Sequence, residues 1–514
     1  MEKLFYNGNV ITLNKRRDLQ EAVYVCNDKI VKVGNNQDLF EASTEKTEKI
    51  DLKGKTLIPG IIDSHTHLSS MGFTFIYSNL SQVKTVEEGL AILSDAVASH
   101  NTEVIIGFNC PNLLWADKAY ISRKTLDNIS NKIPVMAIRA DGHFMALNGK
   151  AIEKYGLENN IRGSNPKEGI FTEEGAKKIW KILGDLNNDK IEEALIAASE
   201  YAVSQGITSI HDFAIYSNCF AFSKLGPRLR LRTNLFLWEN DRSLLDIRIK
   251  ELKNNIKDSN MLKFGGVKLF ADGVIDDRSA ANYSPYNQDL KNSGNLLLKK
   301  GELREITGDC NRDGLQVAVH AIGEKAIEYV IDEYENRRTI NNDVRNRIEH
   351  LELADVEHFR RMAECNIIAS MQPNFLDSYE RGAYKTILPK HLYNKANSFQ
   401  SALACQVPLA FGSDMLPFDP WFGISQTINS TRYNSCLNLE DALLAYTAGG
   451  AYASFEEDIK GTIENEKLAD IIVLNKDPYK CEDFDELRVE KTYLGGMLVY
   501  NNQDVNSKSG KGQL

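Results

Sequence analysis

The sequence predicts an α/β protein: a (β/α)8 TIM barrel, a small β-sandwich built from both termini, and an insertion after the first barrel strand. Three observations indicate this fold. Apolar strand-like runs alternate with helical patterns through the middle of the chain, which is typical of parallel βαβ units. Short β-rich runs occur near both ends of the chain. Histidine, lysine and aspartate lie at or near the ends of several middle strands, where barrel enzymes place their chemistry.

Both termini contribute to the predicted small domain. Four short β-rich runs in the first part are separated by turn material, and they cover residues 3–6, 10–13, 22–25 and 30–33. Two similar runs near the other end cover residues 469–474 and 489–500. Because chain termini often lie close together, we expect a composite sandwich from residues 1–56 and 455–505, followed by a polar tail over 506–514.

Residues 57–454 are expected to form the barrel. Eight apolar runs serve as its strands, and they lie within residues 57–68, 206–213, 229–238, 265–272, 315–320, 347–352, 366–372 and 407–414. Residues 73–190 do not fit this count and are interpreted as an insertion between the first two strands. The βα loops of a barrel lie over its active site, so we expect the insertion to act as a lid or a substrate wall.

Composition excludes several classes of function. The 514-residue chain carries a formal net charge of -10, which argues against a nucleic-acid partner. No apolar run approaches the ~20 residues of a membrane span, and the N-terminus lacks a secretory pattern. The eight cysteines are scattered, so we expect free thiols in a reducing compartment. We therefore expect a cytoplasmic protein with a small-molecule substrate, and a homodimer only because dimers are common.

The stretch 57–68 is the strongest functional signal, because it ends in His65-Thr-His67. Side chains at positions i and i+2 of a strand point to the same side, so both imidazoles would project together from one strand end. Two neutral imidazoles suit a divalent ion such as zinc. The alternative is a surface strand that happens to carry two histidines.

Four further residues lie at or near later strand ends: Lys268, His320, His350 and Asp414. Singly, each histidine has a structural alternative as a buried hydrogen-bonding residue, and Asp414 has one as a helix cap. Lys268 is harder to explain structurally, because a lysine in an apolar strand is costly unless it is paired or modified. A carbamylated Lys268 would offer a carboxylate able to bridge two metal ions. Together with the histidine pair, these residues favour a metal site at one mouth of the barrel.

The chain resembles the amidohydrolase superfamily, and within it the amidohydrolase-3 (YtcJ-like) branch that includes N-substituted formamide deformylases. The motifs that carry the resemblance appear in family order: Pro-Gly-Ile-Ile-Asp-Ser-His-Thr-His (59–67), Val-Lys-Leu-Phe-Ala-Asp-Gly (267–273), Val-His-Ala-Ile-Gly (319–323), Arg-Ile-Glu-His (347–350), Phe-Gly-Ser-Asp (411–414) and the closing segment 461–470. The resemblance implies a site with one or two divalent ions, expected to be Zn²⁺, in which Lys268 is carbamylated. Its residues would be His65, His67, Lys268, His320, His350 and Asp414.

The resulting hypothesis is a hydrolase of carbon–nitrogen bonds other than peptide bonds, acting on an amide or formamide-like bond. Asp414 would serve as general base towards a metal-activated water, and His350 or His143 would steady the developing oxyanion. Asp272 and Arg278 would orient a polar substrate, although a solvated charged loop explains both equally well. His143 is a candidate substrate contact that is not a metal ligand, with a packing alternative of similar weight.

Two other functions are open at this point. A deaminase of a heterocycle would use one metal ion and a well-placed glutamate, for which Glu324 is available four residues after His320. A non-catalytic scaffold with the same fold would usually lack some of the ligand residues, and here none of the six positions is missing.

Overall fold

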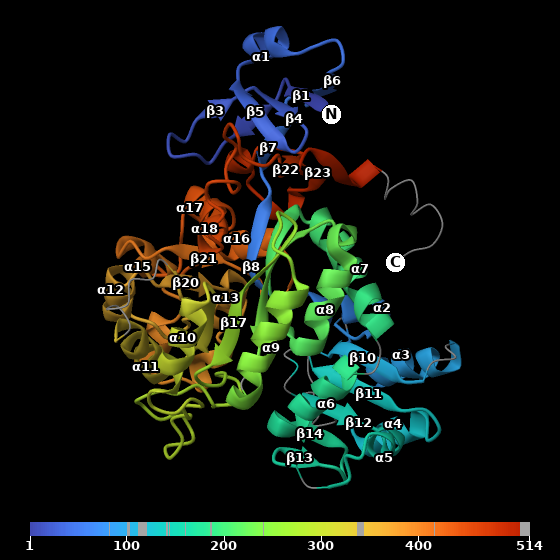
Figure 1. Cartoon of the computed structure of the whole chain (residues 1–514). Coiled ribbons are helices and arrows are strands. Elements are labelled where there is room, and N and C mark those ends of the chain that lie inside the picture. Colours follow the sequence, from blue (N-terminus) through green and yellow to red (C-terminus); the bar gives the residue numbers. More distant parts are fainter. Residues whose placement is uncertain are drawn as a thin grey trace. The chain divides into compact units, whose positions relative to one another are not determined.

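A computed structural model describes residues 1–81, 83–99, 103–110, 121–139, 142, 144–159, 161–185, 188–239, 241–336, 344–415 and 417–503. The chain divides into two compact units. The first unit combines Met1–His67 with Ser199–Leu514, and the second is Leu68–Ala198. Figure 1 colours the chain along its sequence and labels many of its helices and strands.

The first unit contains an eight-stranded parallel sheet, which confirms the predicted (β/α)8 barrel. Its strands in spatial and chain order are β8 (Ile61–Thr66), β15 (Ile207–Ile215), β16 (Arg232–Trp238), β17 (Leu262–Phe270), β18 (Gln316–Ala321), β19 (Arg347–His350), β20 (Ile368–Met371) and β21 (Leu409–Phe411). The main helices that follow these strands are α8 (Tyr216–Leu225), α9 (Arg242–Asn255), α10 (Glu302–Arg312), α11 (Glu324–Glu335), α12 (Val356–Glu364), α15 (Phe399–Ala404), α16 (Pro420–Ile428), α17 (Leu439–Ala445) and α18 (Ala448–Ala453).

The first and last strands meet at Gly412, directly after β21. A Cβ atom on Gly412 would lie 2.3 Å from the backbone nitrogen of His65, so only glycine allows this approach. Two residues further on, the Asp414 N–H donates a 2.8 Å hydrogen bond to the His65 carbonyl oxygen. The barrel mouth is therefore closed by the same two segments that carry His65 and Asp414.

Two further sheets of the first unit come from both termini and pack face to face, as predicted. One sheet has the order β5 (Lys29–Gly34), β4 (Ala22–Cys26), β1 (Glu2–Tyr6), β6 (Glu48–Asp51). The other has the order β24 (Met497–Asn501), β23 (Val489–Leu494), β22 (Ile471–Leu474), β7 (Thr56–Pro59), β2 (Asn9–Ile11), β3 (Leu19–Gln20). Their shared core includes Phe5 and Val25 from the first sheet and Ile471 and Tyr493 from the second.

One boundary differs from the expectation. The apolar run that the sequence assigned to the first barrel strand is divided at Gly60, whose N–H donates to the Asp470 carbonyl oxygen over 2.8 Å. Thr56–Pro59 pairs with β22 in the terminal sheet, and the barrel strand begins only at Ile61. Both segments are fully buried, so hydrophobicity does not distinguish them.

The second unit covers most of the range predicted as an insertion and has its own mixed sheet and core. The sheet order is β13 (Ser164–Asn165), β14 (Ile170–Thr172), β12 (Phe144–Leu147), β11 (Val135–Arg139), β10 (Ile105–Cys110), β9 (Ser78–Asn79). Its helices are α2 (Leu68–Ile76), α3 (Val86–Ser99), α4 (Arg123–Ile129), α5 (Gly149–Lys154), α6 (Glu173–Asp185) and most of α7 (Asn188–Ser204). A lid or wall function for this unit stays a prediction.

Across the described residues, no helix has both the length and the apolar character that a membrane crossing requires.

A buried ion-pair cluster lies near the beginning of the barrel strands. The Lys460 ammonium lies 2.8 Å from Glu456 Oε2 and donates to Ser209 Oγ over 3.1 Å. Lys263 Nζ lies 3.6 Å from the same Glu456 oxygen. Burial by itself would raise the pKa of Glu456, but the two ammonium groups outweigh it and lower the pKa to about 2.

The cluster predicts how stability depends on pH. The folded pKa of Glu456 is below the unfolded value, so its contribution of about 3 kcal/mol is present above pH ~4.5 and is lost as pH falls towards 2. We expect Glu456→Gln to lower the free energy of unfolding at pH 7 and to flatten its dependence between pH 5 and 2, measured by urea denaturation. Asp458→Asn, an exposed neighbour, is the control. Equal pH profiles for wild type and Glu456→Gln would contradict the assignment.

Candidate metal centre

His65 and His67 at the end of β8 meet Asp414 after β21. His65 Nε2 lies 3.4 Å and His67 Nε2 lies 3.2 Å from Asp414 Oδ1. One ligand atom from each of the three residues falls within 4.8 Å of the other two, so the three atoms can hold one ion. The predicted strand-end convergence is present for these three residues.

The other ring nitrogen of each histidine is already engaged. His65 Nδ1 lies 2.7 Å from Glu349 Oε2, and His67 Nδ1 lies 2.9 Å from the Phe213 carbonyl oxygen. Both acceptors require a proton on Nδ1, so the neutral form of each ring has its Nε2 lone pair directed towards Asp414. Histidine ligands of metals are commonly held by such contacts on the far nitrogen.

The position of Asp414 is fixed by Asp63 and Ser413. The Asp63 carboxylate accepts from the backbone N–H groups of His65 and Ser413, over 3.1 and 3.0 Å, and from the Ser413 hydroxyl over 2.6 Å. Asp414 and Met415 have φ angles of 50° and 63°, a left-handed conformation that is uncommon outside glycine. Such a conformation is held at functional sites by surrounding contacts, and here they are the bonds of Asp63 to the preceding Ser413 and the bond of the Asp414 N–H to the His65 carbonyl oxygen.

Lys268 lies inside β17 with 1% of its surface exposed. Its ammonium lies 4.4 Å from the centre of the Phe213 ring, and its Nζ has no hydrogen-bond partner among the described residues. Burial lowers the pKa of Lys268 to about 8. An unpaired buried ammonium is costly, so the position favours either a neutral amine or a modified lysine.

His320 and His350 are the last two of the six predicted metal ligands. The His350 ring centre lies 4.8 Å from that of His65 and 4.5 Å from that of His320. His320 Nε2 also lies 3.0 Å from the Gly273 carbonyl oxygen. Burial lowers the pKa of His65 and of His350 well below the usual value, which keeps both rings neutral as metal binding requires. The donor set therefore fits a divalent ion.

The three predicted substrate contacts have different outcomes. Asp272 is fully buried and accepts from the backbone N–H groups of Ala281, Ile322 and Gly323 over 2.9, 3.1 and 2.8 Å. Its oxygens therefore hold the loops together, and this contact pattern argues against the expected direct contact with a substrate. Arg278 is half-buried in the loop after β17, with a φ of 53°, and its substrate role stays a prediction. His143 lies outside the described residues.

Sequence reasoning missed Arg347 and Glu349, which precede the predicted ligand His350 in β19. Both are fully buried and form an ion pair of 2.7 Å between Arg347 Nε and Glu349 Oε1. The available signal was their presence inside the short predicted barrel strand at 347–352, because charged residues are rarely buried unless they are paired.

The fold and the donor set define a (β/α)8 barrel with a candidate metal centre at its mouth. The profile of the amidohydrolase family matches residues 48–500, so the chain belongs to the amidohydrolase family. This confirms the resemblance that the motifs indicated.

Several relatives align along nearly the whole chain. Protein LONG AFTER FAR-RED 3 of Arabidopsis thaliana is 28% identical, with 97% of this chain and 91% of that protein covered. The N-substituted formamide deformylase of Arthrobacter pascens is 24% identical, with 97% and 98% covered. An uncharacterised metal-dependent hydrolase of Pyrococcus furiosus has a similar crystal structure, with a TM-score of 0.80, 27% identity, and 93% of this chain and 100% of that chain covered.

The group of His65, His67 and Asp414 predicts which histidines hold metal. We expect His67→Ala to lower the metal bound per chain after dialysis, because it removes one of three convergent ligand atoms. His391→Ala should bind metal like wild type, because His391 is an exposed residue that contacts Ser284. Metal analysis by plasma mass spectrometry measures both. Undiminished metal in the His67→Ala protein would remove His67 from the centre.

Proposed function

We propose that the protein hydrolyses a carbon–nitrogen bond of a small molecule, an amide or formamide-like bond, with a divalent metal ion bound at the barrel mouth. The convergence of His65, His67 and Asp414 carries this proposal, because neutral imidazoles and a carboxylate are typical ligands of Zn²⁺ in hydrolases. Membership of the amidohydrolase family and the formamide deformylase among the relatives support the bond type.

One or two ions, with zinc as the proposed metal, would be held by His65, His67, Lys268 as a carbamate, His320, His350 and Asp414. A bound divalent ion supplies Lewis acidity, which polarises a carbonyl and lowers the pKa of water to near neutrality. Carbamylation explains the unpaired Lys268 amine. A neutral lysine nitrogen forms a bond to CO₂ and loses a proton, and the product is a carboxylate that suits the same donor set.

Asp414 is the proposed general base. Its side chain is 19% exposed, whereas that of His65 is 1% exposed, so Asp414 combines contact with the histidines and access to solvent. The carboxylate would accept the proton of the attacking water and pass it to the leaving nitrogen. His350 would orient the carbonyl oxygen and steady the charge that develops on it.

A deaminase is a less favoured alternative, for a structural reason. Its candidate glutamate, Glu324, begins α11, and its Oε2 lies 2.8 Å from the Lys395 ammonium. The Tyr283 N–H donates to its other oxygen over 3.3 Å. Both oxygens are engaged by residues other than the histidines, which makes this glutamate a poor candidate for proton transfer at the metal centre.

Asp414→Asn tests the proposed base. The amide cannot accept the proton, so we expect kcat to fall by about 100- to 10,000-fold while the fold and most of the metal are retained. The assay measures ammonia, amine and formate release from a panel of amides and N-formyl amines. Asp458→Asn makes the same chemical change at an exposed aspartate outside the proposed metal site, so it is the matched control. Wild-type turnover by Asp414→Asn would remove Asp414 from the reaction, and a metal-loaded wild type without turnover on the panel would overturn the proposed function.

The carbamate on Lys268 is tested separately. We expect native mass spectrometry to show an added mass equal to one CO₂, absent from Lys268→Ala. The variant should lose bound metal and recover part of it when acetate or propionate is added, because a small carboxylate can occupy the space. No added mass, together with unchanged metal in Lys268→Ala, would contradict carbamylation.

A further inference from the structure

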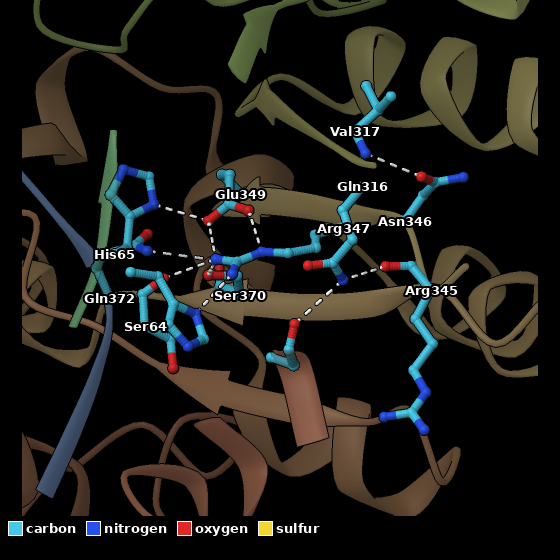
Figure 2. A network of polar contacts seen from close by, with 12 residues as sticks. Ser64, His65, Gln316, Val317, Arg345, Asn346, Arg347, Glu349, Ser370 and Gln372 are labelled. Atoms are coloured by element: carbon cyan, nitrogen blue, oxygen red, sulfur yellow. Dashed lines mark hydrogen bonds and ion pairs between the residues drawn. The ribbon is translucent and has the colours of Figure 1, made fainter. Parts of the chain in front are cut away.

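We propose that Glu349, held by Arg347, is a positioning residue that fixes the tautomer of His65 and thereby sets the metal affinity of the centre. The inference rests on the proposed function, because it assigns a role at the same metal site. The residues involved form one network inside the barrel (Figure 2).

The Arg347 guanidinium is fully buried and locks the Glu349 carboxylate from one side. Nε donates to Glu349 Oε1 over 2.7 Å, and Nη2 lies 3.0 Å from Glu349 Oε2. Nη2 also contacts the Ser64 carbonyl oxygen over 2.7 Å and the Ser370 hydroxyl over 2.9 Å. Such a two-point contact defines the plane of the carboxylate as well as its place.

Glu349 contacts His65 from the side opposite to Asp414. Its Oε2 lies 2.7 Å from His65 Nδ1, and Glu349 itself has no exposed surface. Because Arg347 donates to both carboxylate oxygens, Glu349 acts as an acceptor, and the hydrogen in the contact comes from His65 Nδ1. The Nε2 atom of His65 then carries a lone pair and no hydrogen.

The Nε2 atom of His65 depends on this arrangement. It is buried, has no hydrogen-bond partner among the described residues, and lies 3.4 Å from Asp414 Oδ1. With the opposite tautomer, Nε2 would carry a hydrogen and donate towards Asp414, so it could not bind a metal ion. Contacts of this kind behind a ligand typically change metal affinity by about 10- to 100-fold when they are removed.

Glu349→Gln tests the tautomer directly. Arg347 would attract the amide oxygen of the glutamine, which turns the amide NH₂ group towards His65 Nδ1. The amide then donates where the carboxylate accepted, so His65 Nδ1 must accept and its hydrogen moves to Nε2. We expect the affinity for Zn²⁺, measured by competition with a chelator, to fall by about 10- to 100-fold.

Glu352→Gln is the matched control. Glu352 is also buried, two residues after His350, and its Oε2 accepts from the Tyr379 hydroxyl over 2.9 Å. A glutamine accepts the same bond, so we expect the metal affinity of this variant to equal that of wild type. Melting temperatures of the metal-free proteins separate a loss of stability from a loss of affinity.

The outcomes are distinguishable. Wild-type Zn²⁺ affinity in a folded Glu349→Gln protein overturns the positioning role and leaves the proposed function intact. A wild type that binds no metal overturns both. If Glu349→Gln does not fold, ¹⁵N-histidine NMR of the metal-free wild type decides, with the His65 signal assigned from His65→Ala. A hydrogen on His65 Nδ1 supports the proposal, and a hydrogen on Nε2 overturns it.

Discussion

The closure of the barrel between β8 and the segment after β21 is the constraint on which the candidate site depends. Gly412 allows the two backbones to approach, and the Asp63 carboxylate then ties His65 and Ser413 together through three hydrogen bonds. These contacts hold Asp414 in a left-handed backbone conformation beside the histidines. A ligand at the first strand and a carboxylate after the last strand meet only because a closed sheet makes those strands neighbours.

The barrel interior combines this site with several buried charges that do not favour stability by themselves. Moving an arginine and a glutamate out of water costs several kcal/mol per ion, and good geometry is needed to offset it. Arg347 and Glu349 have that geometry, whereas the Lys268 ammonium lies against Phe213 without a hydrogen-bond partner in the described part of the chain. Apolar side chains in the barrel interior would avoid this desolvation cost. We therefore interpret the buried charges as residues that position the ligands of the candidate metal centre.

Much of the fold followed from sequence patterns, and the exceptions have a common cause. Strand and helix alternation predicted the barrel, and β-rich runs at both ends predicted the terminal sheets. The division of one apolar run at Gly60 was not predictable, because both halves are equally buried and differ only in their pairing partners. Asp272 was interpreted as a substrate contact or as part of a solvated charged loop, yet it accepts hydrogen bonds from three backbone N–H groups of other loop positions.

The sequence by itself determined which residue types were available: the His65 and His67 pair at a strand end, a lysine in an apolar strand, and an aspartate after the last strand. Local periodicity is sufficient for this, because side-chain direction along a strand repeats every second residue. Only the tertiary structure decided that Asp414 lies close to the Nε2 atoms of both histidines and that Glu349 contacts the Nδ1 atom of His65. These contacts join residues hundreds of positions apart, and their geometry depends on how the sheet closes.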